Sequence, residues 1–141
     1  MEKRKLNDPW EELEMKLNSI VGAYSIIIGI MMAGMWLVFA AAGQIPEIDT
    51  KPREIAFHLA AEFITAFALV AGGLGLALRR RWGYPLNMAA LGMLGYSVVV
   101  SPGYYAQREE YAFVGMFALL MALTIGMIAT SIWKREDLQA E

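Results

Sequence analysis

The residues best suited to chemistry are His58 and Glu62, four positions apart in an otherwise apolar stretch of the chain. In an α-helix this spacing places both side chains on one face, where they could share a proton or coordinate one metal ion. A metal site normally needs three or four ligands. His58 is the only histidine and there is no cysteine, so one chain supplies too few ligands unless a dimer doubles them. We therefore predict that the site holds no metal and no cofactor.

The helical face that carries Glu62 continues inward with small residues. At about 100° per residue, Thr65 and Gly72 share this face, whereas Phe67 lies on the opposite side. In a membrane, the bulky side should face lipid and the polar side should face the other helices. Gly72 and the adjacent Gly73 are then predicted to let a neighbouring helix pack closely.

The depth of Glu62 in the membrane makes its charge costly. A helix that begins near Pro52 places Glu62 about 15 Å along its axis, close to the middle of the hydrocarbon core. A charged carboxylate at that depth costs about 2.5–3.5 kcal/mol. Glu62 must therefore be neutral, paired or next to water, and desolvation favours the neutral acid.

A second group of polar side chains follows the third apolar stretch, in VVVSPGYYAQREEY, residues 98–111. Pro102 disfavours helix at Ser101, and Gly103 permits a sharp reversal, so we expect the helix to end there. That end would lie on the same side of the membrane as Glu62. The side chains that could converge on His58 and Glu62 are Tyr96, Ser97, Ser101, Tyr104, Tyr105 and Gln107. We predict that these side chains and Thr65 line a polar pocket that opens outward.

Each of these polar groups also has a structural interpretation. The tyrosines could form an aromatic belt at the membrane interface. His58 and Glu62 could hydrogen bond only to neighbouring helices and hold them together, although an intramembrane carboxylate is by default a candidate functional site. Both interpretations of Glu62 stay open.

The helices that would position these residues follow from four apolar segments. Hydrophobic residues make up 57% of the 141 residues, which is high for a water-soluble domain and indicates a membrane protein. The segments span residues 19–43, 55–78, 85–101 and 111–133. Each is close to the roughly 20 residues that cross a bilayer as a helix, and the runs are continuous rather than alternating, as strands would be. We predict one all-α domain, residues 1–141, that forms a four-transmembrane-helix bundle.

The residues before the first segment predict a short amphipathic helix. In NDPWEELEMKLN, residues 7–18, Asp8 has the position of a helix N-cap and Pro9 that of the first helical residue. Leu13 and Leu17 recur at helical spacing. We expect an N-terminal interfacial helix that lies on the membrane surface ahead of the first span.

The distribution of basic residues predicts the orientation in the membrane. Nine of the twelve Lys and Arg residues fall in the N-terminal leader, at residues 79–81 and in the C-terminal tail, whereas three fall on the other side. The positive-inside rule then places the N- and C-termini of this multi-pass cell-membrane protein in the cytoplasm. The net charge of −2 argues against binding to nucleic acid.

The stretches HLAAEFITAFALVAGGLGL and LGMLGYSVVVSPGYYAQ resemble small four-span membrane proteins of archaea and bacteria. The resemblance covers about residues 55–125 and is most specific at SPGYYAQ. It implies the four-span fold and implies no activity. The chain is also faintly similar in size and span number to small multidrug transporters. Their membrane carboxylate lies in the first span, whereas Glu62 lies in the second.

These observations favour a non-enzymatic membrane protein that binds a small molecule or lipid around His58 and Glu62, with binding linked to a proton on Glu62. One alternative is a structural or accessory subunit of a membrane complex. Another is an intramembrane redox or metal-dependent enzyme that uses His58, although no motif such as G-x-S-x-G or H-E-x-x-H occurs. The expected partners are membrane lipids and a small molecule, with a homo-oligomer left open.

Overall fold

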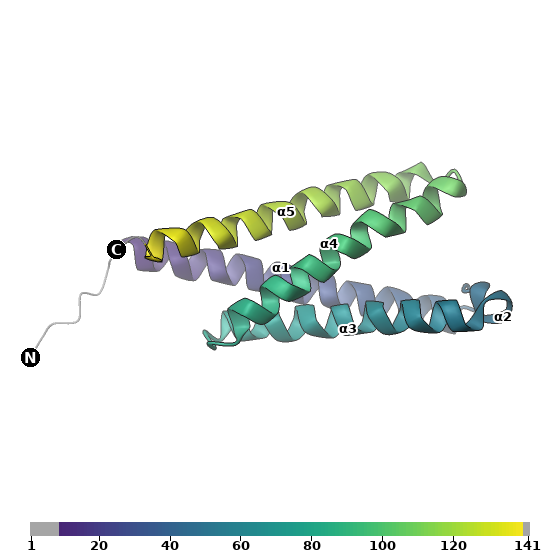
Figure 1. Cartoon of the computed structure of the whole chain (residues 1–141), viewed down its shortest axis with the longest axis horizontal. Coiled ribbons are helices and arrows are strands. Elements are labelled where there is room, and N and C mark those ends of the chain that lie inside the picture. The colour runs from purple at the N-terminus through teal and green to yellow at the C-terminus, as the bar shows by residue number, and fades with distance from the viewer. Residues whose placement is uncertain (1–8, 140–141) are drawn as a thin grey trace, which may run out of the picture.

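The computed structural model describes residues 9–139, and within them the side chains of Pro9 and of residues 11–133. The described chain is helical and contains no strand, which confirms the predicted all-α class. Its helices are α1 (Pro9–Ala41), α2 (Glu47–Thr50), α3 (Pro52–Ala77), α4 (Gly83–Gln107) and α5 (Tyr111–Gln139). All of these except the short α2 contain a segment long and apolar enough to cross a membrane. Figure 1 shows these long helices running back and forth along the long axis of the bundle.

The leader is helical, as predicted, but it is not a separate helix. α1 begins at Pro9 and continues for 33 residues to Ala41 without a break. At 1.5 Å per residue it is about 50 Å long, well beyond the roughly 30 Å hydrocarbon core. The expected interfacial segment therefore forms the first turns of α1, because no proline after Pro9 interrupts the helix. Asp8, the predicted cap, lies outside the described residues.

The predicted end of the third span is wrong, because α4 continues through Pro102 to Gln107. Proline removes one backbone donor, a loss that membrane helices tolerate where neighbouring groups compensate. The chain reverses only after α4. Glu109 takes a left-handed conformation with φ 60°, and the N–H of Glu110 donates to the carbonyl of Tyr105 over 3.0 Å, which closes the helix end. The segment that begins at Pro102 therefore extends α4 at its C-terminal end.

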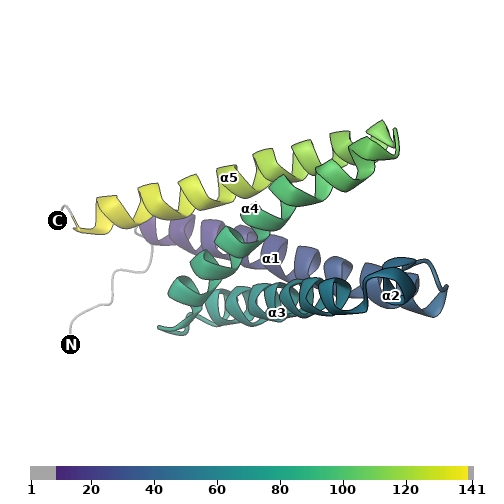
Figure 2. The same ribbon diagram turned by 45° about the vertical axis from the view of Figure 1, so that its right-hand side comes forward.

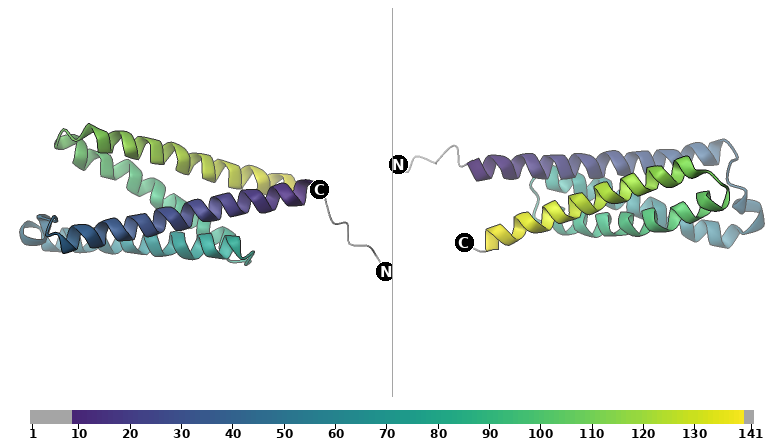
Figure 3. Two further views of the ribbon diagram at one scale, coloured as in Figure 1. Left: turned by 180° about the vertical axis from the view of Figure 1, so that it is seen from behind. Right: turned by 90° about the horizontal axis from the view of Figure 1, so that it is seen from above.

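Helices that follow one another in the chain pack side by side. The short α2 apart, α1 packs along α3, α3 along α4, and α4 along α5. α5 meets α1 over a small area and does not approach α3 within the described chain. Figures 1 and 2 show the α4–α5 hairpin diverging from α1 and α3 toward the end that carries α2, and the rear view in Figure 3 agrees. Fewer helices therefore cover α3 at that end.

The buried face of α3 matches the predicted helical phase. Glu62, Thr65 and Gly72 are buried, whereas Phe67 on the opposite side is 72% exposed. The exposed apolar side chains are expected where lipid takes the place of water around the bundle. The enclosed core is correspondingly small, and Leu69 of α3 is one of its fully buried side chains.

Glycines set the closest approaches of α3 to both of its neighbours. A Cβ atom built on Gly72 would lie 2.7 Å from the Cα of Asn87 in α4. A Cβ atom on Gly73 would lie 2.6 Å from the carbonyl oxygen of Gly22 in α1. Both contacts are with backbone, which cannot move aside as the end of a flexible side chain can. The predicted packing residues thus lie where backbone meets backbone on two sides of one helix.

We expect Gly72→Ala to destabilise the protein by about 1–3 kcal/mol, because the new methyl group must push α3 and α4 apart. The matched control is Gly92→Ala in α4, where no atom lies within 4 Å of the new Cβ position. This control should leave stability unchanged or raise it, since alanine favours helix. Thermal unfolding in detergent compares the two variants, and equal effects would contradict the assignment of Gly72 to a close contact.

Candidate functional site

Glu62 forms a polar junction among three helices. Its side chain comes from α3 and is only 8% exposed. The hydroxyl of Ser97 in α4 donates to Oε1 over 2.7 Å. The indole N–H of Trp36 in α1 donates to Oε2 over 3.4 Å. Each carboxyl oxygen therefore has a hydrogen-bond partner, and the two partners belong to different helices.

Close packing of the helices, two turns before each residue, positions Trp36 and Ser97. In α1, Gly29 lies against Ala66 of α3, where a Cβ atom would be 2.7 Å from the Ala66 carbonyl oxygen. Trp36 follows Gly29 by two helical turns and so extends from the same side of α1. In α4, Ser97 follows the fully buried Ala90 by two turns in the same way. Both side chains thus reach the level of Glu62.

His58 lies near this junction but is exposed to the surroundings of the bundle. Its ring meets the ring of Trp36 edge-on, with the centroids 5.5 Å apart and an interplanar angle of 78°. It makes no hydrogen bond to Glu62. The direct contact that the spacing allowed is therefore absent, and His58 touches the junction through Trp36. Divergence of the helices toward this end explains why this face of α3 is uncovered at His58.

One further predicted site residue bonds within its own helix, and two others make no hydrogen bond to Glu62. The Thr65 hydroxyl is buried and donates to the Ala61 carbonyl of its own helix over 2.8 Å. Ser101 is half-buried, and its hydroxyl makes no hydrogen bond with the part of the chain that the structure describes. Tyr96 is 73% exposed although its neighbour Ser97 faces Glu62. The structure brings only Ser97 of these α4 residues to the carboxyl group.

The last three predicted residues lie beyond the junction, at the C-terminal end of α4. Because α4 stays helical, Tyr104 sits about 10 Å further along the axis than Ser97. The ring of Tyr105 stacks on Phe113 of α5, with the centroids 4.7 Å apart. Gln107 is exposed. The expected convergence on Glu62 failed because it required the chain to fold back at Pro102, which it does not do.

The hydroxyl of Tyr104 belongs instead to a surface contact with the turn after α4. Arg108 donates to the Tyr104 hydroxyl over 2.6 Å and also lies 3.3 Å from a carboxylate oxygen of Glu110. The hydrogen bond to Tyr104, followed by the nearby acidic groups, raises the pKa of the Arg108 guanidinium. This arginine stays charged at the turn between α4 and α5.

The hydrogen bonds around Glu62 suit both protonation states of its carboxyl group. An indole N–H only donates, so Oε2 must act as an acceptor in either state. A serine hydroxyl donates or accepts, so Ser97 can donate to a carboxylate or accept the proton of a neutral acid. Neither change requires a heavy atom to move. The site can therefore take up and release a proton without losing either hydrogen bond.

The side chains at this junction suit a metal ion less well than a proton. Trp36 offers no lone pair, and Ser97 supplies one neutral hydroxyl. Among the side chains that the structure describes, no three His, Cys, Asp or Glu residues come together. The chemistry that the geometry supports is hydrogen bonding and proton exchange.

Trp36 is the site residue that the sequence did not predict. It stands within an uncharged segment, where an aromatic residue usually packs against lipid or core. The available signal was its spacing of seven residues from Gly29, but that signal gains meaning only once Gly29 is known to face α3.

We expect Trp36→Phe to lower stability by about 1–2 kcal/mol, because it removes the donor to Oε2 and keeps an aromatic ring. Trp133→Phe is the matched control, since Trp133 is 69% exposed. The control should change stability by less than about 0.5 kcal/mol. Detergent unfolding curves measure both, and a Trp36 variant as stable as its control would show that the indole N–H contributes nothing to the junction.

Comparison with known proteins identifies a family for this chain but no activity. No curated protein and no solved structure matches the chain. A family model described as a domain of unknown function (DUF8058) matches residues 15–141. The match covers α3, α4 and α5 and all of α1 after its first turns. The chain therefore belongs to this family, the domain of unknown function DUF8058.

Proposed function

We propose that this membrane protein binds a small molecule or lipid at the Glu62 junction and that binding is linked to protonation of Glu62. The observation that carries the proposal is the carboxyl group itself, buried among three helices with a partner that serves both protonation states. A carboxyl group at this depth is a functional candidate because it is expensive to keep there.

Ligand binding and protonation are linked because both compete for the carboxyl oxygens of Glu62. A ligand that offers an amine, a cation or another hydrogen-bond donor would bind the carboxylate form of Glu62. A proton on the same group removes the charge and occupies one oxygen. Ligand and proton therefore exclude each other, and such a ligand binds more tightly once Glu62 has lost its proton.

The exposed ring of His58 supports approach from the end of the bundle that carries α2. His58 and Trp36 form an aromatic edge beside the carboxyl group. Aromatic faces attract organic cations and pack against acyl chains. A ligand with a polar head and an apolar body would meet suitable chemistry at both ends. Membrane lipids belong to this class.

The orientation in the membrane is part of the proposal. Figure 1 shows the two described ends of the chain and the α3–α4 turn at one end of the bundle. In the sequence, nine of the twelve basic residues fall in the N-terminal leader, at residues 79–81 or in the C-terminal tail, so the positive-inside rule supports a cytoplasmic location for that end. The junction would then be reached from the outer side. The prokaryotic origin and a family-wide SPGYYAQ motif likewise stay predictions.

Single cysteines test this orientation cleanly, because the chain has no cysteine of its own. Ile48→Cys places a thiol on the exposed α2, and Arg80→Cys places one in the exposed α3–α4 turn. In intact cells, a membrane-impermeant maleimide should label the first variant and should label the second only after permeabilisation. The reverse pattern would put the Glu62 junction on the cytoplasmic side.

Glu62→Gln tests the proton linkage. The amide mimics the neutral acid, since its oxygen can accept from Trp36 while its nitrogen donates to Ser97, so stability should change by less than about 1 kcal/mol. Infrared difference spectra across pH should show a carboxyl C=O band in the wild type that is absent from Glu62→Gln. The exposed control Glu54→Gln should keep the band.

A structural role is the competing function, and the same junction gives it support. Both carboxyl oxygens are satisfied by neighbouring helices, which is what a residue that only holds helices together would show. Under this alternative the wild type shows no titrating C=O band that Glu62→Gln removes. Ligand-dependent stabilisation in a screen of amines and lipids would also be unaffected by the substitution.

A further inference from the structure

Among the described residues, the half of the bundle nearer the α3–α4 turn holds two buried side-chain polar atoms without a hydrogen-bond partner. They are the hydroxyl oxygen of Ser25 in α1 and the side-chain carbonyl oxygen of Asn87 in α4. Ser25 is 0% exposed and Asn87 is 1% exposed. Burying such an atom without a partner is costly, and native proteins normally satisfy it through protein or an ordered water.

The helix contacts place Ser25 and Asn87 at the same level of the bundle. Gly22 of α1 lies against Gly73 of α3, and Gly29 of α1 lies against Ala66. Ser25 falls between these two contacts and so lies near the level of Gly72. Asn87 packs directly against Gly72 from the other side.

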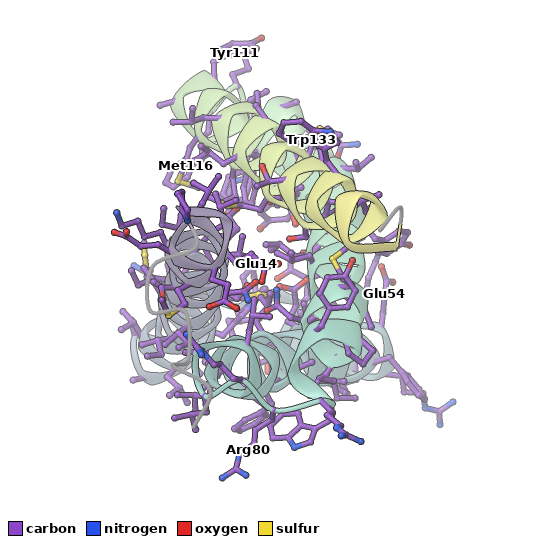
Figure 4. The ribbon with its side chains drawn as sticks, turned by 90° about the vertical axis from the view of Figure 1, so that its left-hand side faces the viewer. Glu14, Glu54, Arg80, Tyr111, Met116 and Trp133 are labelled. Carbon is purple, nitrogen blue, oxygen red and sulfur yellow. The ribbon has the colours of Figure 1, made fainter. Side chains whose placement is uncertain are left out.

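Other polar groups lie near the level of Ser25 and Asn87. The hydroxyl of Tyr24 in α1 lies 2.8 Å from that of the buried Thr124 in α5. Glu14 and Asn18 precede Ser25 at helical spacing and share its side of α1. Figure 4 looks along the bundle from this end and shows Glu14 pointing from α1 into the interior. The inner part of the bundle is thus polar on α1, α4 and α5.

We propose that Ser25 and Asn87 enclose a bound water molecule next to Gly72. Water can donate to the Asn87 oxygen and can donate to or accept from the Ser25 hydroxyl, so one molecule satisfies both atoms. A metal cation fits less well, because hard cations take six or more oxygen ligands and usually include carboxylates among them. The two atoms that call for a partner here are neutral.

This water site is separate from the Glu62 junction. Gly72 lies about 15 Å along α3 from Glu62. Leu69 of α3 and Leu91 of α4 are each 0% exposed and occupy the level between them. The protein would therefore contain two polar layers inside the membrane, divided by a dry apolar layer. The inference does not depend on the proposed function.

A double-mutant cycle tests whether one molecule joins the two atoms. Ser25→Ala and Asn87→Leu should each lower the melting temperature in detergent by about 3–5 °C. The double variant should lose clearly less than the sum, because either change alone already releases the shared water. If Asn87→Leu does not fold, Asn87→Thr replaces it in the cycle.

The control cycle pairs Asn87→Leu with Thr65→Val. The Thr65 hydroxyl is buried too, but it is satisfied within its own helix, so these two effects should add. Additive effects in the Ser25 cycle as well would overturn the shared water.

A structure of the wild-type protein at a resolution that shows water gives the direct test. The expected result is a density peak within hydrogen-bond distance of both the Ser25 hydroxyl and the Asn87 carbonyl oxygen. Direct contact of the two side chains with no peak between them would overturn the proposal. So would a peak with six oxygen ligands that disappears when sodium is replaced by a large organic cation.

Discussion

Close contact between helix backbones at the glycines of α3 is the constraint on which the bundle depends. In lipid, apolar side chains gain little by leaving the surroundings for the interior, so helix association relies on tight packing and on polar contacts. Gly73 admits the backbone of α1 and Gly72 admits the backbone of α4. At the end of α3, Gly75 and Gly83 bring the α3–α4 turn together in the same manner. α3 is the helix on which the other two assemble.

The polar junction at Glu62 is a consequence of this packing. Once α1 and α4 are held against α3, residues further along each helix have their positions fixed by helical geometry. Trp36 and Ser97 then reach one carboxyl group from opposite helices, although neither is near Glu62 in sequence. The hydrogen bonds add polar contacts between helices that backbone packing has already brought together. A substitution that loosens the packing at Gly72 or Gly73 should therefore disturb the Glu62 junction as well.

α5 has a different relation to the bundle. It packs along α4, meets α1 over a small area and does not approach α3 in the described chain. Its contact with α1 is polar, through Tyr24 and Thr124, and Phe113 near its N-terminal end stacks on Tyr105. The α4–α5 hairpin thus diverges from α1 and α3 at the end where His58 is exposed (Figure 1). This arrangement leaves the aromatic edge of the junction open to molecules in the membrane.

The sequence by itself determined the four apolar helices, the start of α3 at Pro52 and the side of α3 that is buried. These properties are local, because segment length, proline position and a 3.6-residue period are written along one stretch of chain. Glu62 and Gly72 could therefore be predicted to face the interior before any neighbour was known.

Only the tertiary structure decided what meets Glu62. The rotation and axial offset of α1 and α4 depend on contacts such as that of Gly29 with Ala66, which no single segment encodes. Trp36 could therefore not be foreseen as a partner, and Tyr104 could not be excluded. The continuation of α4 past Pro102 has the same cause. A proline favours the end of a helix locally, but packing and the left-handed cap at Glu109 move the end of α4 to a later residue.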